Sequence, residues 1–426
     1  MLIFWLFVAL VVMICLNVPI AVALAVSGIL GLLATEGLDS LVTVALDMYD
    51  GSTKFSLIAI PMFVLAGAIM NAAGITDRLI NFISALIGFV RGGLAMVNIG
   101  VSLFFAEISG SAVADVAALG SVMIPQMKKR GYSGPLAAAV TSSSASLAII
   151  IPPSIPMILY AVSANTSVEQ LFVAGFVPGL IGAAGLMGVA YVFARRYNLP
   201  VEETFNTGRL RKTFVAALPT FALPVIILGG IFGGFVTATE AAGLAVLAAL
   251  AIGLFYRELD LKHLKSAMLD GGMQTAVVML LVASSVLMGG FLTRAQMPQE
   301  LAASILEFTT NKYLILLILN FFFLVIGFFL HSAAAIILVV PIVIPLITQV
   351  GIDPVHFGLI VTLNLAIGQQ TPPVASVLIT ACSIARANIW DVTKVNIYFI
   401  AVLLAVLLLC TYVPAVPMFL VDYFYR

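Results

Sequence analysis

Residues 142–161 read SSSASLAIIIPPSIPMILYA, and residues 367–378 read IGQQTPPVASVL. Each stretch places two consecutive prolines inside a long apolar segment. Proline has no backbone N–H and clashes with the preceding helical turn, so both segments should form helices that break in the middle. These are the only Pro-Pro pairs in the chain, and they lie 220 residues apart, at positions 152 and 372.

The same offset aligns other parts of the two halves. Residues 124–131 correspond to residues 344–351, with Ile-Pro at the start and Gly at the end of each. Ahead of each Pro-Pro pair, two shorter apolar segments are separated by small or polar residues, Ser-Gly-Ser at 109–111 and His-Ser at 331–332. Interrupted apolar segments at corresponding positions of two repeats indicate a transporter whose site lies near the middle of the membrane.

Composition identifies the solvent of this chain as lipid. Of its 426 residues, 62% are hydrophobic and 9% are charged, and the mean hydropathy is +1.20. A soluble chain carries about 25% charged residues. The formal net charge is zero, which gives no reason to expect a nucleic-acid partner. The sequence contains neither an H-E-x-x-H pair nor a phosphate-binding G-x-x-x-x-G-K-[ST] loop, so it predicts neither an enzyme nor an ATPase.

Apolar segments of about 20 residues predict membrane spans. We expect them at about 1–16, 18–34, 56–74, 136–163, 170–194, 214–234, 237–256, 268–293, 357–384 and 395–421, with 75–91 and 297–311 along the membrane surface. Cytoplasmic loops are rich in Lys and Arg. With the N-terminus outside, only four of the 19 basic residues remain on the outer side, namely Lys54, Arg294, Lys312 and Arg426. Both termini should therefore lie outside and the linker 195–213 inside.

Each half then has five spans, and an odd number makes the second half enter the membrane upside down. We place the first repeat at 1–205 and the second at 206–426. The segments 94–108 and 112–127 reach only about 24 Å at 1.5 Å per residue, and basic residues flank both outer ends. They predict a re-entrant helical hairpin at about 94–127, matched by one at about 313–349. Two pairs of ordinary spans remain the alternative.

The sequence therefore predicts an all-α polytopic membrane protein with two inverted five-span repeats. Each repeat would hold a re-entrant hairpin and a Pro-Pro broken helix, at about 136–163 and 357–384. Non-helical backbone is tolerated inside a bilayer only where it is buried in protein or lines a wet cavity. The two tips and the two breaks should therefore meet near the centre of the membrane.

These breaks predict the chemistry of the site. Free carbonyls and Ser or Thr hydroxyls without carboxylates favour a monovalent cation such as Na⁺, and opposing helix N-termini suit an anionic substrate. The candidate substrate-binding residues are Ser111, Ser143, Ser332, Asn364 and Pro373. Such Ser and Thr side chains also commonly bond the backbone of their own helix, and that alternative stays open. The roles of Glu107, Asp115, Glu240 and His331 stay open as well.

Four stretches carry a resemblance to a known family. They are FAEISGSAVADVAALGSVMIPQMKKRGY (105–132), SSSASLAIIIPPSIPMILYA (142–161), TATEAAGLAVLAALAIGLFYREL (237–259) and IGQQTPPVASVL (367–378). Together they cover both halves. The sequence resembles the large membrane subunit of the tripartite ATP-independent periplasmic (TRAP) transporters, of the dicarboxylate or sialic-acid type.

The resemblance implies an elevator-type, sodium-driven importer of a small organic acid in the bacterial inner membrane. Its partners would be a periplasmic substrate-binding protein and a small four-helix membrane subunit. By motif, the resemblance assigns sodium binding to Ser109, Gly110, Ser111, Pro153, Ser154, Gly368 and Thr371. A stand-alone Na⁺/dicarboxylate symporter and, from another class, an ion channel are the alternatives. The sequence does not identify which organic acid is carried or how many sodium ions accompany it.

Overall fold

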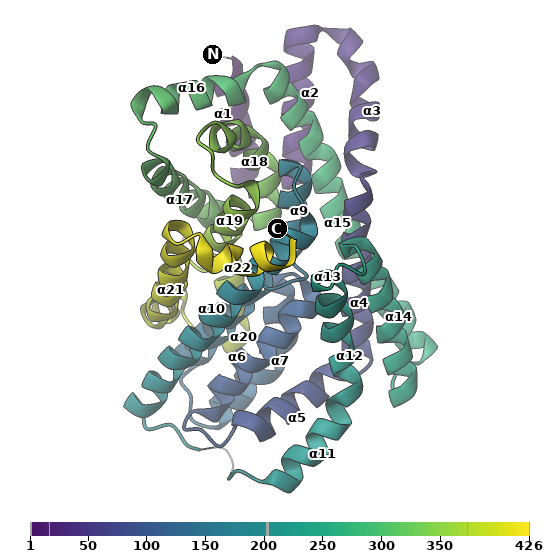
Figure 1. Ribbon diagram of the computed structural model, residues 1–426, viewed down its shortest axis with the longest axis vertical. Helices are drawn as coiled ribbons and strands as arrows, with labels where there is room; N and C mark the ends of the chain where they lie inside the picture. Colours follow the sequence, from purple (N-terminus) through teal and green to yellow (C-terminus); the bar gives the residue numbers. More distant parts are fainter. Residues whose placement is uncertain (1, 17, 202–203, 373, 426) are drawn as a thin grey trace.

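The structure is a computed structural model that describes residues 2–16, 18–201, 204–372 and 374–425, with the side chains of 2–4, 11, 15 and 106–109 not described. Figure 1 shows the arrangement of its helices. Within the described ranges, the only β-type pairing is an isolated bridge between Arg91 and Val201. The prediction of an all-α fold is confirmed.

The elements of the first half occur in the following order. They are α1 (Leu2–Cys15), α2 (Ile20–Glu36), α3 (Leu41–Ser52), α4 (Ala59–Ala72), α5 (Ile75–Ile87), α6 (Gly93–Ser109), α7 (Ala112–Lys129), α8 (Gly134–Ala145), α9 (Ile155–Ala164) and α10 (Val168–Arg196). Three short 3₁₀ turns join these helices. One precedes α3 (Leu38–Ser40), one precedes α4 (Phe55–Ile58) and one follows α8 (Ser146–Ile149).

The elements of the second half follow. Its helices are α11 (Thr207–Ala217), α12 (Ala222–Pro224), α13 (Gly230–Phe232), α14 (Ala238–Tyr256), α15 (Leu261–Arg294), α16 (Met297–Phe308), α17 (Lys312–Phe329), α18 (Ser332–Gln349), α19 (Pro354–Gly368), α20 (Ser376–Ala385), α21 (Ile389–Tyr412) and α22 (Ala415–Tyr425). A 3₁₀ turn at Leu218–Phe221 and a π-helical turn at Val225–Gly229 connect α11, α12 and α13.

The helices other than α5 and α16 divide into two groups. We call α1–α4 and α11–α15 the scaffold helices, and α6–α10 and α17–α22 the core helices. Within the scaffold, α4 packs on α14 and α2 packs on α15, so each contact joins the two halves of the chain. In Figure 1, α5 and α11 lie at the bottom and α16 lies at the top, at opposite ends of the molecule. The core meets the scaffold chiefly where α18 packs on α15 and α6 packs on α4.

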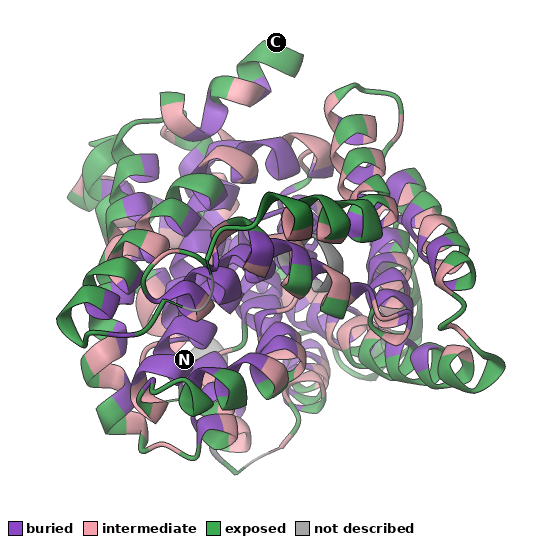
Figure 2. Ribbon diagram, turned by 90° about the horizontal axis from the view of Figure 1, so that it is seen from below, coloured by how far each residue is buried: buried purple, intermediate pink, exposed green. Residues whose placement is uncertain are grey.

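The innermost helices are the first parts of the two broken helices. Every residue of α8 from Leu136 to Ala145 is buried, and so is every residue of α19 from Val355 to Gly368. A helix that is buried on every face must be covered on all sides: α7, α20 and α21 cover α8, and α10, α17 and α21 cover α19. Figure 2 shows this buried centre, with exposed residues around it.

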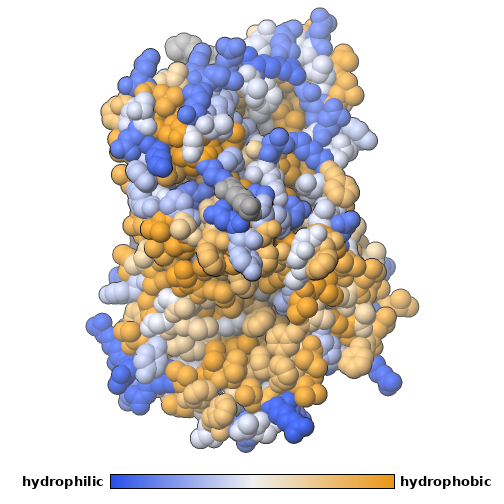
Figure 3. All heavy atoms as spheres, in the orientation of Figure 1, coloured by the Kyte–Doolittle hydropathy of each residue, from blue (hydrophilic) through white to orange (hydrophobic). Residues whose placement is uncertain are grey.

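The outer surface is that of a membrane protein. Figure 3 shows a belt of hydrophobic side chains across the middle and lower part of the molecule, with hydrophilic groups gathered at its two ends. Among the described residues, 8 helices are long and apolar enough to cross a membrane. The prediction of a multi-pass membrane protein is confirmed. The relative inversion of the two halves remains a prediction.

The two hairpin tips differ in backbone conformation. At the first tip, Gly110 is left-handed, with φ of +57°, and Ser111 is extended, so that α7 folds back onto α6. At the second tip, both Leu330 and His331 are extended. There α17 packs mainly on α19, whereas α18 packs on α9, α15 and α16. The arms of the second pair consequently make few contacts with each other.

Both proline-containing segments break their helices. The first break covers residues 150–154 and ends where Ser154 caps α9. The second begins at Gln369, after α19, and ends at Ala375, whose φ is +40°. Pro156 is the second residue of α9. A proline is tolerated there because the N–H groups of the first turn have no acceptor within the helix, so no hydrogen bond is lost.

Two segments differ from the predicted spans. Helix α3 lies outside them, because Asp47 and Asp50 lower its hydropathy; it forms by packing along α15. The predicted span 395–421 is two helices, since α21 ends at Tyr412, just before Pro414, and α22 packs on α10. The residue before a proline is pushed out of the helical region, and Val413 has φ of −122° and ψ of 77°.

Ion pairs tie the scaffold together at both of its ends. At one end, Arg78 of α5 donates two hydrogen bonds to Glu258, at 3.1 and 2.6 Å, and its guanidinium lies 3.8 Å from the centre of the Tyr256 ring. The hydrogen bond from Arg78 lowers the pKa of the Glu258 carboxyl. At the other end, Arg294 pairs with Glu36 at 3.0 Å and with Asp47 at 3.2 Å. The first cluster joins α5 to the segment after α14, and the second joins the end of α15 to α2 and α3.

The topology predicts which face of the membrane each loop occupies. Thr204→Cys, in a background without the three native cysteines, should react with a membrane-impermeant thiol reagent only in inside-out vesicles. Thr204 is preferable to Asn206, because the Asn206 side chain accepts a hydrogen bond from Arg209 N at 3.0 Å and caps α11. Thr310→Cys, an exposed position before α17, serves as the opposite control and should react only in right-side-out vesicles. Labelling of Thr204→Cys from the outer face would overturn the charge argument.

Candidate functional site

A central cavity of about 530 Å³ lies between the core helices and the scaffold helices α4 and α15. Both tips contribute to its lining, and so do residues at or directly beside the two breaks. The residues that do so are Gly110, Ser111, Ile149, Ile155, His331, Ser332, Gln369 and Ser376. The facing wall comes from Val64 of α4 and from Met273, Gln274, Val277 and Val278 of α15. The structure therefore brings together the four interruptions that the sequence places far apart.

Four core helices begin at this cavity. α7 starts at Ala112, α9 at Ile155, α18 at Ser332 and α20 at Ser376, and each of these residues lines the cavity. A helix N-terminus carries unpaired N–H groups and the positive end of the helix dipole. No Asp or Glu occurs among the described lining residues. The electrostatic character of the cavity therefore suits an anion.

The first tip touches the first break through backbone. A Cβ atom on Gly110 would lie 3.1 Å from the carbonyl oxygen of Pro153, so a side chain there would press on that carbonyl. Ser154 caps α9, because its hydroxyl accepts from the N–H of Met157 at 3.4 Å while donating to the carbonyl of Ile149 at 2.8 Å. The backbone carbonyl of Pro153 thus lies next to the glycine turn, and the residue that follows it carries the capping hydroxyl.

The second break is held by close backbone contact. A Cβ atom on Gly368 would lie 2.5 Å from the Cα of Gly327, so α17 and α19 meet where both residues lack side chains. The hydroxyl of Thr371 donates to the carbonyl of Ile367 at 3.0 Å, which leaves its oxygen lone pairs available. A larger residue at either glycine would push the two helices apart.

The candidate substrate-binding residues divide into three groups. Ser111 and Ser332 line the central cavity. Ser143 and Asn364 are fully buried and do not line it: the Ser143 hydroxyl donates to Val140 O at 3.1 Å, and the Asn364 amide donates to Asn320 Oδ1 at 2.7 Å. Pro373 lies outside the described residues.

The remaining polar candidates are placed as follows. Gly110, Pro153, Ser154, Gly368 and Thr371 lie at the tips and breaks described above, whereas the side chains of Ser109 and Glu107 lie outside the described residues. Asp115 is buried in the first turn of α7. Glu240 accepts from Thr237 N at 2.8 Å in a capping box at the start of α14, which is a structural role. His331 lines the central cavity.

A buried hydrogen-bond chain connects the two breaks, and part of it was not anticipated. Gln370, in the second break, donates to the hydroxyl of Ser146, in the turn before the first break, at 2.6 Å. Asn396 of α21 donates to both the carbonyl and the side-chain oxygen of Gln370, at 3.4 Å each. Asn396 was missed by the sequence reasoning, and the signal that would have found it is a lone amide inside an apolar span.

Gln274 of α15 is a second residue that was missed. It lines the central cavity and also a neighbouring cavity of about 550 Å³, which includes Asn71, His263 and Asp270 at the predicted inner side. The two cavities also share Met273. The two cavities therefore lie next to each other along α15, with the second on the predicted inner side.

The oxygen atoms near the breaks fit a monovalent cation. Among the described residues, no group of three or more His, Cys, Asp or Glu side chains could hold a metal ion. The side-chain oxygen of Asn364 is buried without a hydrogen-bond partner, near the close contact of α17 and α19. The carbonyl of Pro153 at the first break and the hydroxyl of Thr371 at the second are likewise neutral oxygen donors, whereas Ca²⁺ is usually bound with carboxylates.

Comparison with known proteins gives a family match over nearly the whole chain. The family model described as "Tripartite ATP-independent periplasmic transporter, DctM component" matches residues 7–416. The chain is 40% identical over 410 residues to the isethionate TRAP transporter permease protein DctMQ of Oleidesulfovibrio alaskensis, covering 95% of this chain and 64% of that relative's length. It is 37% identical to the C4-dicarboxylate TRAP transporter large permease protein DctM of Pseudomonas aeruginosa, covering 94% of each chain.

A solved structure shares the fold. The YdaH transporter of Alcanivorax borkumensis superposes with a TM-score of 0.63 and covers 89% of each chain. Its sequence identity to this chain is 14%, so the likeness concerns the fold alone.

The buried chain between the breaks predicts a stability effect. Gln370→Leu removes the donor to Ser146 and the acceptor of Asn396, and should lower the free energy of unfolding in detergent by about 1–3 kcal/mol, the cost of leaving buried polar groups unpaired. Gln299→Leu, an exposed position on α16, is the matched control and should stay within about 0.5 kcal/mol. The double variant Gln370→Leu/Ser146→Ala should lose less than the sum of the two single changes. Additive losses would contradict a shared hydrogen bond.

Proposed function

The chain belongs to the family of DctM components of the tripartite ATP-independent periplasmic transporters, and on this basis we propose that it is the permease subunit of a sodium-driven importer of a small organic acid. It is a multi-pass protein of the bacterial inner membrane. Its relatives are transporter permeases, which fits a protein that moves its substrate without altering it.

The central cavity is the observation that carries the choice of substrate. Four helix N-termini end at it, and no carboxylate lines it among the described residues. Preorganised N–H groups bind carboxylate and sulfonate oxygens without a basic side chain. The cavity volume of about 530 Å³ is in the range of small-molecule sites. A small carboxylate or sulfonate is the substrate class that fits.

Sodium is proposed as the driving ion. The donor set near the breaks is neutral, and it includes the otherwise unpaired amide oxygen of Asn364. Gly110, Pro153 and Ser154 would hold an ion at the first break, and Gly368 and Thr371 at the second. A cation bound beside the helix N-termini adds positive charge to the central cavity, so cation and anion would each strengthen the binding of the other.

The cavities along α15 support an elevator mechanism. The central cavity shares Met273 and Gln274 with the cavity at the predicted inner side. It shares no lining residue with the cavity at the predicted outer side, which begins at Val282 of α15. We propose that the core helices carry the central cavity along this face of the scaffold, and that the structure has it open inwards.

Two partners complete the proposed transporter. A large TRAP permease works with a small membrane subunit and a periplasmic binding protein, and we propose that the small subunit has four helices. One relative is named DctMQ and is longer than this chain, which spans 64% of it. The binding protein would deliver the acid to the outer side.

The driving ion is tested by removing one proposed ligand. Thr371→Val keeps the shape of the side chain and deletes its oxygen, so the sodium concentration for half-maximal uptake should rise about tenfold, equivalent to 1.4 kcal/mol. The measurement is uptake of labelled succinate, isethionate and sialic acid into proteoliposomes, with the partner proteins and a sodium gradient. Ser109→Ala should behave in the same way at the first site.

Thr380→Val is the matched control. Its hydroxyl donates to the backbone carbonyl one turn back, Ser376 O, at 2.9 Å, just as that of Thr371 does within its own segment. It should leave the sodium dependence unchanged. Unchanged sodium dependence in both Thr371→Val and Ser109→Ala would reject the cation sites. Uptake that needs no binding protein would favour a stand-alone symporter, and unitary current without substrate would favour a channel.

A further inference from the structure

A second, smaller cavity of about 170 Å³ lies between scaffold and core on the predicted outer side. Its scaffold wall comes from Lys54 before α4 and from Val282, Ser285 and Val286 of α15. Its core wall comes from Leu159, Val162 and Ser163 of α9 and from Ile337 and Pro341 of α18. Val282 lies four residues beyond Val278 of the central cavity, or about 6 Å along α15.

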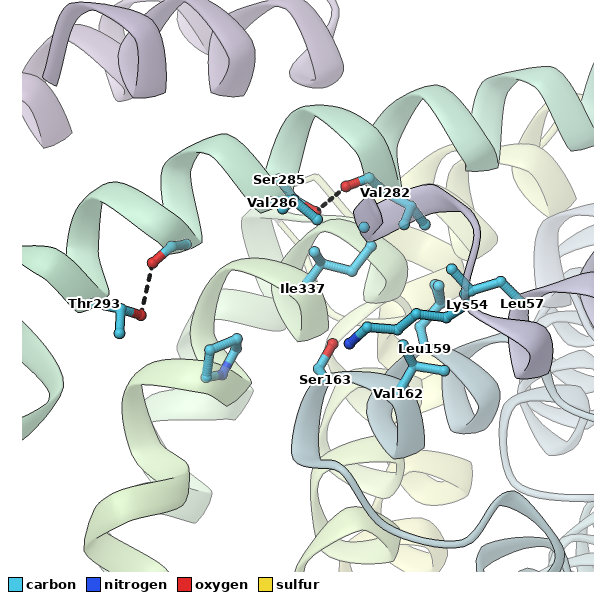
Figure 4. A pocket seen from close by; sticks show the side chains of 13 residues that line it. Lys54, Leu57, Leu159, Val162, Ser163, Val282, Ser285, Val286, Thr293 and Ile337 are labelled. Carbon is cyan, nitrogen blue, oxygen red and sulfur yellow. Dashed lines mark hydrogen bonds between the residues drawn. The ribbon is translucent and has the colours of Figure 1, made fainter. Parts of the chain in front are cut away.

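Two polar side chains face this cavity from opposite walls. Figure 4 shows Lys54 reaching from the scaffold towards Ser163 of α9. Within the described part of the chain, neither the Lys54 ammonium nor the Ser163 hydroxyl forms an ion pair or a hydrogen bond, and the cavity lining contains no Asp or Glu. By contrast, the hydroxyl of Ser285 in the same cavity is engaged, since it donates to Val282 O at 2.6 Å.

Lys54 is an exposed residue, but it lacks the ion pair with a nearby acid that is usual for a lysine in such a position. A lysine near the edge of a bilayer usually extends its ammonium into water along apolar surface, and an exposed lysine on a helix usually pairs with an acid one turn away. Asp50 is one turn before Lys54, but no ion pair between them is found among the described residues. Asp47, the next acid along α3, pairs instead with Arg294 at 3.2 Å. The ammonium is directed into the gap between the two groups of helices.

We propose that Lys54 and Ser163 form a second anion-binding site, which holds the carboxylate or sulfonate of the transported acid on the outer side. The ammonium supplies the charge and the Ser163 hydroxyl a hydrogen bond. This rests on the proposed function, because the occupant is the acid that the central cavity carries. The volume of about 170 Å³ exceeds the space of a single water and accommodates the charged end of a small acid.

The proposed site gives the two sides of the membrane different affinities. Lys54 belongs to the scaffold, whereas the tip residue Ser332 belongs to the core and lies five residues before Ile337 of the outer cavity on the same helix. If the core moves outwards along α15, Ser332 approaches Lys54, and the acid is held by the helix N-termini and the ammonium together. When the core returns inwards, the ammonium stays behind. The acid would then be bound more weakly where it is released.

Transport kinetics test the contribution of the charge. Lys54→Gln should raise the external concentration of succinate or isethionate for half-maximal uptake about tenfold, which corresponds to 1.4 kcal/mol, in proteoliposomes that contain the partner proteins. Lys54→Arg keeps the charge and should stay close to the unchanged protein. The sodium dependence should be the same in all three. Equal half-saturation in Lys54→Gln and the unchanged protein would overturn the proposed site.

Thiol labelling tests the site without transport. Ser163→Cys, in a background without the native cysteines, should react faster with a sulfonate-bearing methanethiosulfonate reagent than with a trimethylammonium-bearing one. Adding Lys54→Gln should remove that preference. Succinate or isethionate should slow the labelling, whereas inorganic phosphate at equal ionic strength should not. Labelling without charge preference, or equal protection by phosphate, would overturn the site for an organic acid.

The two tests separate the possible failures. If the unchanged protein takes up none of the labelled acids, the proposed function fails, and the charge preference of Ser163→Cys still reports whether the outer cavity attracts anions. If the unchanged protein transports and Lys54→Gln behaves identically, the outer site fails while the proposed function stands.

Discussion

The requirement that a broken helix inside a bilayer be surrounded by protein determines most of this architecture. Lipid offers no partner for an unpaired N–H or carbonyl group, so interrupted backbone must be buried or must face a wet cavity. The two Pro-Pro segments are therefore placed at the centre, with α8 and α19 completely enclosed. Both tips and both breaks border one cavity, and the backbone groups that lipid cannot solvate become the groups available to a ligand.

The same constraint explains why the two halves are joined so closely. Gln370 of the second half bonds Ser146 of the first at 2.6 Å, and Asn396 bonds Gln370 from a third helix. Within the scaffold, α2 packs on α15 and α4 packs on α14, so each half completes the other. Neither half could enclose its own break alone. Ion pairs at opposite ends of the molecule hold helices together, while the face of α15 towards the core is lined by cavities.

The sequence predicted the structure well where a residue type restricts the backbone conformation in only one way. Proline pairs predicted the breaks, and Gly110 predicted the first tip, which is left-handed. It was uninformative where tertiary packing decides. Helix α3 forms against α15 although its aspartates lower its hydropathy, and the extended conformation of Leu330 and His331 separates the arms of the second pair. Ser143 and Asn364 lie in the predicted segments yet do not line the cavity, because the sequence of one helix does not show which of its faces meets the cavity.

The residues that escaped prediction share one property, which is that each acts across the boundary between scaffold and core or between two breaks. Gln274 belongs to a scaffold span but lines the central cavity. Asn396 bonds Gln370, which in turn bonds Ser146, 250 residues before Asn396 in the sequence. A lone polar side chain in an apolar span is expensive unless it has a partner or a task, so its occurrence is a signal even when its partner is unknown. The same reasoning applies to Lys54, a charged side chain at the predicted edge of the membrane. Its charge is directed at the surface along which the core is proposed to move, and a charge fixed on one side of that surface acts only while the core is beside it.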